Sequence, residues 1–375
     1  MHDTPGDSAD ANLKRWLADC LIDPVDPPTP LPAGSEAALL DLAEAEGVGV
    51  LLAYHARRHS LSLSPHSLSR LQQLERSRVA SNLSRQQEVE SLLADLEVAG
   101  VPVLLVKGEA LAHRLYPEPH LRARADSDLL FADKAGAECA WRLLQARGYA
   151  RKPTLQGRFV GFQFPCTREI APGAHMQFDL HNQSSDYLWF ARRLTFVEFM
   201  ADSEELVLGT RACRGPGPVH ALLHACAHRV ANRPYGTENR LVWLYDIHLL
   251  ARELSQSGRW QAFCRAAADK QLARICLEGL SHSGQWFGAE FDLQPLLAAS
   301  ADEERGLSMS STRRSLFLAD LLHNPGTANK LRQLREHLLP APAYMRARYS
   351  LGSSFWLPLY YLLRLLRGLV RPWLG

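Results

Sequence analysis

The chain has no C-x-x-C pair, although it contains seven cysteines among its 375 residues. Zinc ribbons use closely spaced thiolate pairs as ligands, so that kind of structural zinc site is excluded. An odd number of scattered cysteines also differs from the disulfide framework of a small secreted domain. We therefore expect reduced thiols and a cytoplasmic protein.

Long apolar runs are missing as well. Residues 1–12 are polar and acidic, whereas a secretory signal needs an apolar core. No stretch of roughly 20 residues, the length that spans a bilayer, is both apolar and uncharged. The nearest approach is residues 355–374, which carry three arginines. The sequence predicts neither a secretory signal nor a transmembrane segment.

There is little net charge. The formal value of +2 is too small for a dedicated nucleic-acid coat protein, although a local basic patch remains compatible with it. Apolar residues make up 46% and charged residues 22%, which is an ordinary globular composition. The length suffices for two or three modest domains.

The residue pattern changes twice along the chain. Residues 1–97 form a helical region with a proline-rich linker at 23–34; apolar side chains recur at helical spacing over 35–56, and Ser64 is the expected N-cap of a helix over 65–96. Residues 98–215 mix short apolar runs with helical segments. Residues 216–375 are helical again. The predicted fold is α+β, a small mixed β-sheet core flanked by N-terminal and C-terminal helical regions.

The individual elements are predicted as follows. In the core we expect strands at 101–106, 128–131, 159–164 and 174–181, and helices at 109–116 and 135–147. In the C-terminal region we expect helices at 218–231, 241–255, 260–268, 272–286, 315–323 and 356–373.

Three features carry chemistry. Asp126 and Asp128 flank one residue at the start of an apolar strand, so both carboxylates lie on one face, where a divalent cation would relieve their repulsion. Lys107-Gly108 forms the turn between a strand and a helix, where free N–H groups and an ammonium suit phosphate. Alone, a D-x-D pair is more often a solvated strand end, and a Lys-Gly turn is as often an ordinary turn with a surface lysine.

The third feature is the segment 174–182, which alternates strictly between polar and apolar residues. Asp179 and His181 share its polar face. An ordinary half-exposed strand looks the same. If this strand pairs beside the strand that follows Asp126 and Asp128, three carboxylates converge. Such a set can hold two metal ions. One ion bridges the triphosphate, and the other activates an acceptor hydroxyl for attack on the α-phosphate.

Residues 103–131 (VLLVKGEALAHRLYPEPHLRARADSDLLF) resemble an uncharacterised bacterial nucleotidyltransferase family of the polymerase-beta-like superfamily. The shared pattern is an apolar strand, Lys-Gly, a short helix ending in Tyr-Pro, an arginine and a D-x-D-L-L strand. Residues 178–181 are similar to that family's third-carboxylate strand, and residues 220–250 resemble the helical part that follows.

The resemblance implies a nucleotidyltransferase core at residues 98–215. It implies Mg²⁺ or Mn²⁺ as cofactor and a nucleoside triphosphate such as ATP as co-substrate. The expected catalytic and metal-binding residues are Asp126, Asp128 and Asp179. The expected nucleotide-binding residues are Lys107, Gly108, Arg122 and His181.

The chain departs from the wider superfamily at the turn. Lys-Gly replaces the usual Gly-Ser or Gly-Gly, and a helix and a loop separate Gly108 from Asp126. Glu109 follows directly and would repel phosphate unless it faces away. We expect the acceptor to be a small molecule, a protein or a sugar rather than nucleic acid, and its identity stays open.

Other residues have structural or functional interpretations. His220, His224 and His228 form one helical stripe, which favours packing or acceptor contact over zinc binding. Asp246 lies in an apolar helix and needs a partner, for which Arg229 and Arg240 are candidates. The segment 355–374 fits a terminal helix docked on the core, and peripheral membrane contact is the alternative.

Two other functions compete with the enzyme. One is a non-catalytic nucleotide-binding or regulatory protein that retains the fold. The other is a helical interaction protein whose carboxylates are merely on the surface.

Overall fold

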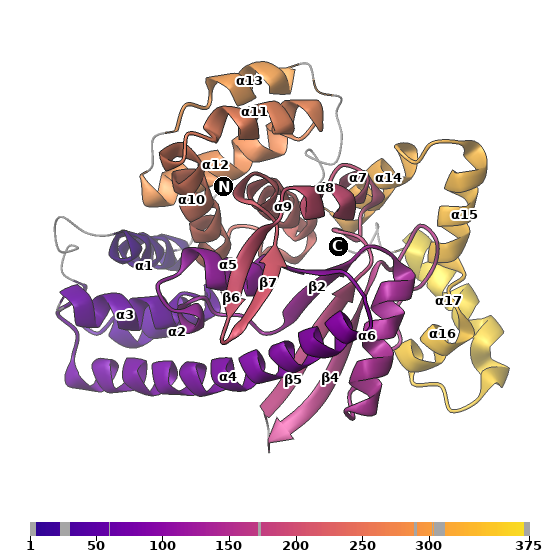
Figure 1. The fold of residues 1–375 in the computed structure, drawn as a ribbon, viewed down its shortest axis with the longest axis horizontal. Coiled ribbons are helices and arrows are strands. Elements are labelled where there is room, and N and C mark those ends of the chain that lie inside the picture. The colour runs from indigo at the N-terminus through magenta and orange to yellow at the C-terminus, as the bar shows by residue number, and fades with distance from the viewer. Residues whose placement is uncertain are drawn as a thin grey trace.

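The centre of the molecule is a five-stranded sheet (Figure 1). The computed structural model describes residues 5–22, 31–59, 61–171, 174–288, 291–301, 303 and 312–370. The strand order is β1-β2-β5-β4-β3, and β2 and β5 are parallel whereas the other neighbours are antiparallel. The strands are β1 (Val103–Val106), β2 (Ser127–Phe131), β3 (Ala150–Arg151), β4 (Gln163–Ala171) and β5 (Ala174–His181). The predicted α+β fold with a small mixed sheet is confirmed.

The N-terminal region is helical, as predicted. It consists of α1 (Pro5–Leu21), α2 (Glu36–Ala45), α3 (Gly49–His59) and α4 (Pro65–Val98). The helical pattern over 35–56 forms two helices because Gly47 adopts a left-handed φ of 76° between them. Ser64 caps α4 by accepting a hydrogen bond from the Ser67 N–H, as predicted. Residues 23–30 of the proline-rich linker lie outside the described residues.

Shorter elements surround the sheet. They are α5 (Lys107–Leu115), η1 (Pro119–Leu121), α6 (Lys134–Ala146), α7 (Leu188–Ala191), α8 (Phe196–Ala201) and a hairpin of β6 (Glu204–Leu208) and β7 (Arg211–Gly215). The strand predicted at 159–164 is wrong in position. β4 begins only at Gln163, where antiparallel pairing with β5 begins, and Gly161 has a φ of 70° just before it.

The C-terminal region contains α9 (Pro218–Ala231), η2 (Arg233–Tyr235), α10 (Leu241–Gln256), α11 (Trp260–Asp269), α12 (Ala273–Phe287), α13 (Gln294–Ala301), α14 (Arg313–Leu322), α15 (Thr327–Leu338), α16 (Pro342–Tyr349), η4 (Ser354–Trp356) and α17 (Leu357–Val370). The predicted helices of this region match within a few residues, whereas α13, α15 and α16 were not predicted. Among the described residues, no helix combines the length and the apolar character needed to cross a bilayer.

The helical regions are packed together and against the core. Leu17 and Leu51 of the N-terminal helices share one apolar cluster with Tyr245 and Phe287 of α10 and α12. The C-terminal half of α4 instead packs on the sheet, where Leu92 lies in a cluster with β2 and β5. Leu104 of β1 and Leu130 of β2 share another cluster with α9 to α12, so helices from both ends of the chain pack on the sheet.

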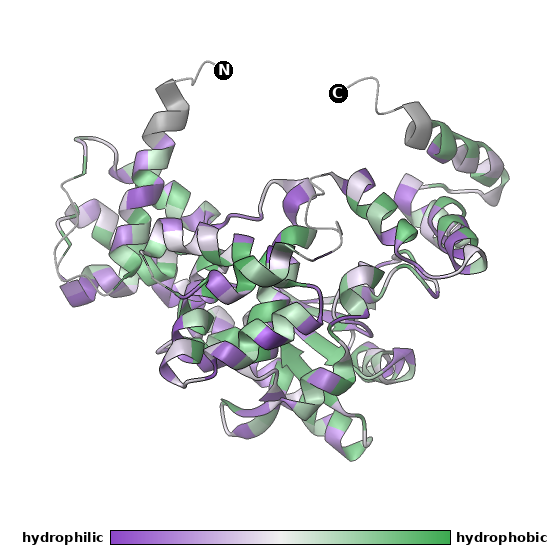
Figure 2. Ribbon diagram, turned by 90° about the horizontal axis from the view of Figure 1, so that it is seen from above, coloured by the Kyte–Doolittle hydropathy of each residue, from purple (hydrophilic) through white to green (hydrophobic). Residues whose placement is uncertain are grey.

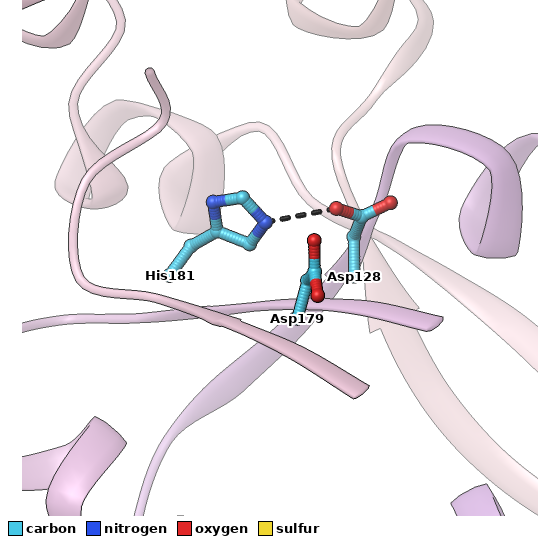
Figure 3. Close-up of side chains that lie close together, drawn as sticks. All are labelled: Asp128, Asp179 and His181. Carbon is cyan, nitrogen blue, oxygen red and sulfur yellow. Dashed lines mark hydrogen bonds and ion pairs between the residues drawn. The ribbon is translucent and has the colours of Figure 1, made fainter. Parts of the chain in front are cut away.

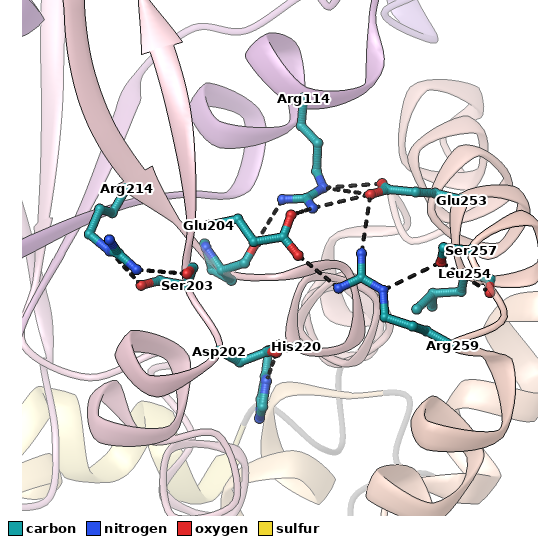
Figure 4. Close-up of polar contacts among 11 residues, drawn as sticks. Arg114, Asp202, Ser203, Glu204, Arg214, His220, Glu253, Leu254, Ser257 and Arg259 are labelled. Atoms are coloured by element: carbon teal, nitrogen blue, oxygen red, sulfur yellow. Dashed lines mark hydrogen bonds and ion pairs between the residues drawn. The ribbon is translucent and has the colours of Figure 1, made fainter.

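A polar cluster joins the hairpin to the C-terminal region (Figure 4). Arg114 of α5 donates to both carboxylate oxygens of Glu253 on α10, at 3.1 and 3.2 Å from its Nε, and also pairs with Glu204 of β6. Arg259 donates to the same Glu204 at 2.7 Å. These charges connect α5, β6 and α10 beside the sheet.

Candidate metal and nucleotide site

The parallel pairing of β2 with β5 places two carboxylates side by side. Asp128 of β2 is the register partner of Asp179 of β5. Partners in neighbouring strands lie about 5 Å apart and point to the same face of the sheet. Two segments about fifty residues apart in sequence therefore present acidic groups at one place. The predicted convergence of the carboxylates depends on this pairing of β2 with β5.

The alternation of β5 explains which side chains reach this place. Met176, Phe178 and Leu180 are buried in the sheet core. Asp179 points to the opposite face, and His181 follows on that same face at the end of the strand, where it is buried. The polar face of β5 therefore supplies both groups.

Asp128, Asp179 and His181 form a compact donor set (Figure 3). One ligand atom from each lies within 4.8 Å of the others. His181 Nε2 is 2.8 Å from Asp128 Oδ1. Asp128 and His181 are almost completely buried, and Asp179 is half-buried. The set has the size and the chemistry of a site for a single metal ion.

Lys107 reaches this group from the turn between β1 and α5. Its Nζ donates to Asp128 Oδ1 at 2.7 Å and lies 3.3 Å from His181 Nε2. Its backbone has a left-handed φ of 51°, a conformation that costs a side-chain-bearing residue about 1–2 kcal/mol. This backbone conformation lies at the turn from which the Lys107 ammonium reaches Asp128.

The carboxylates differ in how well they are neutralised. Burial raises the pKa of Asp128, but the Lys107 ammonium and the His181 hydrogen bond outweigh it, so that pKa is lowered. For Asp179, burial and the neighbouring Asp128 raise the pKa. Asp128 is therefore held ionised, whereas Asp179 is protonated more readily than a free aspartate.

Asp126 lies just before β2 and belongs to the same electrostatic group. Burial raises its pKa to about 7, and Asp128 and Asp179 contribute in the same direction. Its ligand atoms are not part of the compact donor set, in which His181 takes the third place. His181 is thus grouped with the metal-binding candidates by geometry, whereas the sequence motif suggested nucleotide contact.

Gly108 and Arg122 lie together at the turn, and Arg122 lines the same pocket as Lys107. A side chain at Gly108 would collide with the Arg122 guanidinium. Arg122 pairs with Asp246 of α10 at 2.6 Å, and Tyr116 donates to the same carboxylate at 2.7 Å. The predicted partners of Asp246, Arg229 and Arg240, are therefore wrong. Arg229 pairs instead with Glu278 at 2.9 Å.

Glu109 faces away from the carboxylate face, which removes the repulsion that its position suggested. It is fully buried and binds Arg124 at 3.0 Å and the Ser127 hydroxyl at 2.7 Å. Burial opposes its ionisation, but Arg124 and these hydrogen bonds lower its pKa to about 2. Arg85 of α4 also donates to Ser127, at 3.2 Å. This network, which no sequence motif marks, anchors the start of β2.

A small pocket adjoins Lys107 on the side of the C-terminal helices. It has a volume of about 40 Å³, and Lys107, Arg122, His224, His228 and Trp243 are among its lining residues. Each water molecule needs roughly 10–15 Å³ of such volume, so the pocket holds only a few. Burial lowers the pKa of His224 to about 4 and keeps that of His228 well below its ordinary value. Both imidazoles are therefore neutral near neutral pH.

The histidine stripe is not a metal cluster. His224 Nε2 is 2.9 Å from the carbonyl oxygen of Ser184, and His220 Nδ1 is 2.8 Å from Asp202. Within the described part of the chain, the one group of side chains close enough to hold a metal is Asp128, Asp179 and His181. The predicted packing or contact role of the stripe is consistent with this placement.

A protein-family model described as "Uncharacterised nucleotidyltransferase" matches residues 33–288, more than half of the chain. The chain belongs to this nucleotidyltransferase family. The resemblance noted in the sequence is thereby confirmed, and the carboxylates, Lys107 and the pocket all lie within the matched residues. The family match ends before α13.

Comparisons of the chain with curated proteins and with solved structures give less information than the family match. No curated protein matches it. A crystal structure of an antigenic nucleotidyltransferase-like protein from Paracoccidioides brasiliensis is 16% identical, with 52% of this chain and 92% of that chain covered. Its TM-score is 0.34, so its geometry supports no further argument about this site.

Proposed function

We propose that the chain is a metal-dependent nucleotidyltransferase that moves a nucleoside monophosphate from a nucleoside triphosphate, such as ATP, to an acceptor hydroxyl and releases pyrophosphate. The observation that carries the proposal is the juxtaposition of Asp128, Asp179 and His181 within a chain of the nucleotidyltransferase family. Family membership indicates the reaction class, and the donor set indicates where the reaction occurs.

The residues suit a divalent ion. Carboxylate oxygens are preferred ligands of Mg²⁺ and Mn²⁺, and an imidazole is accepted more readily by Mn²⁺. The raised pKa of Asp126, to about 7, reflects burial and carboxylate repulsion, which a cation would relieve. We assign Asp128, Asp179 and His181 to a first ion and Asp126 as an additional carboxylate. A bound ion would neutralise triphosphate charge and increase the acidity of the acceptor hydroxyl.

The remaining residues position the triphosphate. Lys107 presents an ammonium at the carboxylate face, and the N-terminus of α5 begins at this turn. Gly108 lets the Arg122 guanidinium lie against the turn, so that Arg122, held by Asp246, adds positive charge beside Lys107. Asp179, on the open side of the site, is the group that we assign to the acceptor hydroxyl.

The acceptor is a small molecule, a sugar or a protein side chain. The pocket beside Lys107, with its neutral histidines and Trp243, admits a small group rather than a nucleobase. We place the acceptor's reacting end near this pocket.

The first test is thermal stabilisation of the purified chain by each nucleoside triphosphate, with and without Mg²⁺ or Mn²⁺. A ligand at about 100 times its Kd adds about 2.7 kcal/mol, which raises Tm by several degrees. We expect a metal-dependent shift in the native protein and none in the Asp126→Asn/Asp128→Asn variant. Asp126→Asn alone should abolish pyrophosphate release and keep or raise the ligand-free Tm, because it removes a repelled carboxylate.

Asp133→Asn is the matched control. Asp133 caps α6 through the Gly136 N–H, at 2.9 Å, and Asn caps equally well. This variant should retain the shift and the activity. A fully active Asp126→Asn enzyme would sink the assignment of the site. Nucleotide binding without pyrophosphate release under any acceptor would favour the non-catalytic alternative.

A further inference from the structure

Helix α17 shows its apolar side to solvent. Leu359, Leu362 and Leu366 are 45%, 52% and 45% exposed. Their spacing of three and four residues places them on one stripe of the helix. A helix on the surface of a globular protein normally turns such a stripe towards the core. Of the side chains described in α17, none is buried.

Two polar side chains of α17 face the protein instead. The Tyr361 hydroxyl donates to the carbonyl oxygen of Pro340 at 2.5 Å, and Arg364 donates to that of His337 at 2.9 Å. These bonds connect α17 to the end of α15 and the segment before α16. The rotation of the helix about its axis is thereby set, and the leucine stripe points outward as a consequence.

Aromatic side chains extend the stripe at the start of the helix. Phe355 is 79% exposed and Trp356 is 50% exposed. Rings of this kind favour the boundary between the headgroups and the acyl chains of a bilayer. We call Phe355, Trp356, Leu359, Leu362 and Leu366 the α17 face. Figure 2 shows α17 as a largely hydrophobic helix near the C-terminus, at one end of the molecule.

The C-terminal segment that contains α17 is strongly basic in sequence. Residues 313–375 contain ten Arg and Lys side chains against one Asp and one Glu, a formal charge of +8, so residues 1–312 carry −6 of the overall +2. Arg335, Arg346 and Arg348 on α15 and α16 are exposed. The range that matches the family model ends before this region. The basic charge is thus concentrated on the same part of the chain as the exposed apolar helix.

We propose that the α17 face binds the surface of a bilayer that contains anionic phospholipids. The leucine stripe, Phe355 and Trp356 enter the boundary region, and the exposed arginines of α15 and α16 contact the headgroups. A second copy fits the face less well, because a symmetric contact would bring two regions of charge +8 together. The proposal does not depend on the transferase reaction.

The test is co-sedimentation of the full chain with vesicles. We expect binding to phosphatidylcholine mixed with phosphatidylglycerol, little binding to phosphatidylcholine alone, and weakening by salt. Leu362→Ser/Leu366→Ser should reduce the partition coefficient at least about tenfold. Complete burial of one leucine side chain changes a partition coefficient by more than about tenfold, and these two leucines are each about half exposed before they enter the bilayer. Trp356 emission, taken as the difference from Trp356→Phe, should shift to the blue on the anionic vesicles.

The control is Leu83→Ser/Leu297→Ser, which changes leucines of similar exposure, 54% and 52%, on α4 and α13. It should bind vesicles like the native chain, and circular dichroism should show that both double variants are folded. The proposal is overturned if anionic vesicles do not bind the native chain, or if the Leu362→Ser/Leu366→Ser variant binds them equally well. A concentration-dependent dimer lost in that variant, without vesicle binding, would identify a second copy as the occupant.

Discussion

At Gly108 a single missing side chain makes room for the guanidinium of Arg122. We expect Gly108→Ala to displace that guanidinium from Asp246 and to lower the free energy of unfolding by about 1–3 kcal/mol, as overpacking does elsewhere. Urea denaturation measures the difference. The control is Gly352→Ala, since an added Cβ there meets nothing within 4 Å. Equal effects of the two changes would contradict the close approach.

Glu109 makes the free energy of unfolding depend on pH. Its folded pKa of about 2 lies below the ordinary value of 4.5, chiefly because Arg124 and the hydrogen bonds overcome the cost of burial. A carboxyl group of this kind stabilises the fold above about pH 4.5 and loses that contribution as the pH falls towards 2. The full contribution is on the order of 3 kcal/mol.

Glu109→Gln should therefore be less stable than the native chain by about 3 kcal/mol near neutral pH, and the gap should narrow near pH 3. Urea unfolding at the two pH values measures both gaps. A gap that stays constant between them would show that Glu109 acts through packing alone.

At the scale of elements, local patterns predicted most helices and the strand β5, because periodicity and caps are local properties. The pattern also placed Asp179 and His181 on one face. It did not show that β5 lies parallel to β2, since pairing is decided by distant segments. For the same reason the 204–215 hairpin and the Asp246 partner were missed. The start of β4 is likewise set by its pairing with β5, so the strand begins at Gln163 and not at the predicted residue 159.

The pair of Arg122 and Asp246 joins the 119–125 segment to α10. Asp246→Asn leaves a buried guanidinium without its charge partner, so we expect a loss of about 3–5 kcal/mol in the free energy of unfolding. Tyr116→Phe removes one hydrogen bond to the same carboxylate and should cost only about 0.5–1.5 kcal/mol. Denaturant titration of both variants would contradict this view if Tyr116→Phe proved the more damaging.

On the scale of the whole molecule, the division into residues 1–97, 98–215 and 216–375 stays a prediction. The apolar clusters cross it at one boundary, because the N-terminal helices pack on α10 and α12. The N-terminal helices therefore complete the hydrophobic core of the C-terminal helical region, although residues 98–215 separate the two in sequence.

Deleting residues 1–60 should consequently expose Leu241, Val242 and Phe287, which are now almost fully buried. We expect the free energy of unfolding to fall by roughly 5 kcal/mol or more, which is comparable with the whole stability of a domain. Calorimetry of the shortened chain should show no cooperative transition near the native Tm. A transition at the native temperature would show that the rest of the chain folds without residues 1–60.

Arg122 contacts both Gly108 and Asp246, so the Lys107-Gly108 turn and α10 are physically coupled. Whatever steadies that turn must also suppress transient opening of α10, since coupling between two sites is reciprocal. Amide hydrogens of α10 would then exchange more slowly with solvent deuterium when nucleotide is present. The helical region would in this way sense the occupancy of a site to which it contributes no carboxylate ligand.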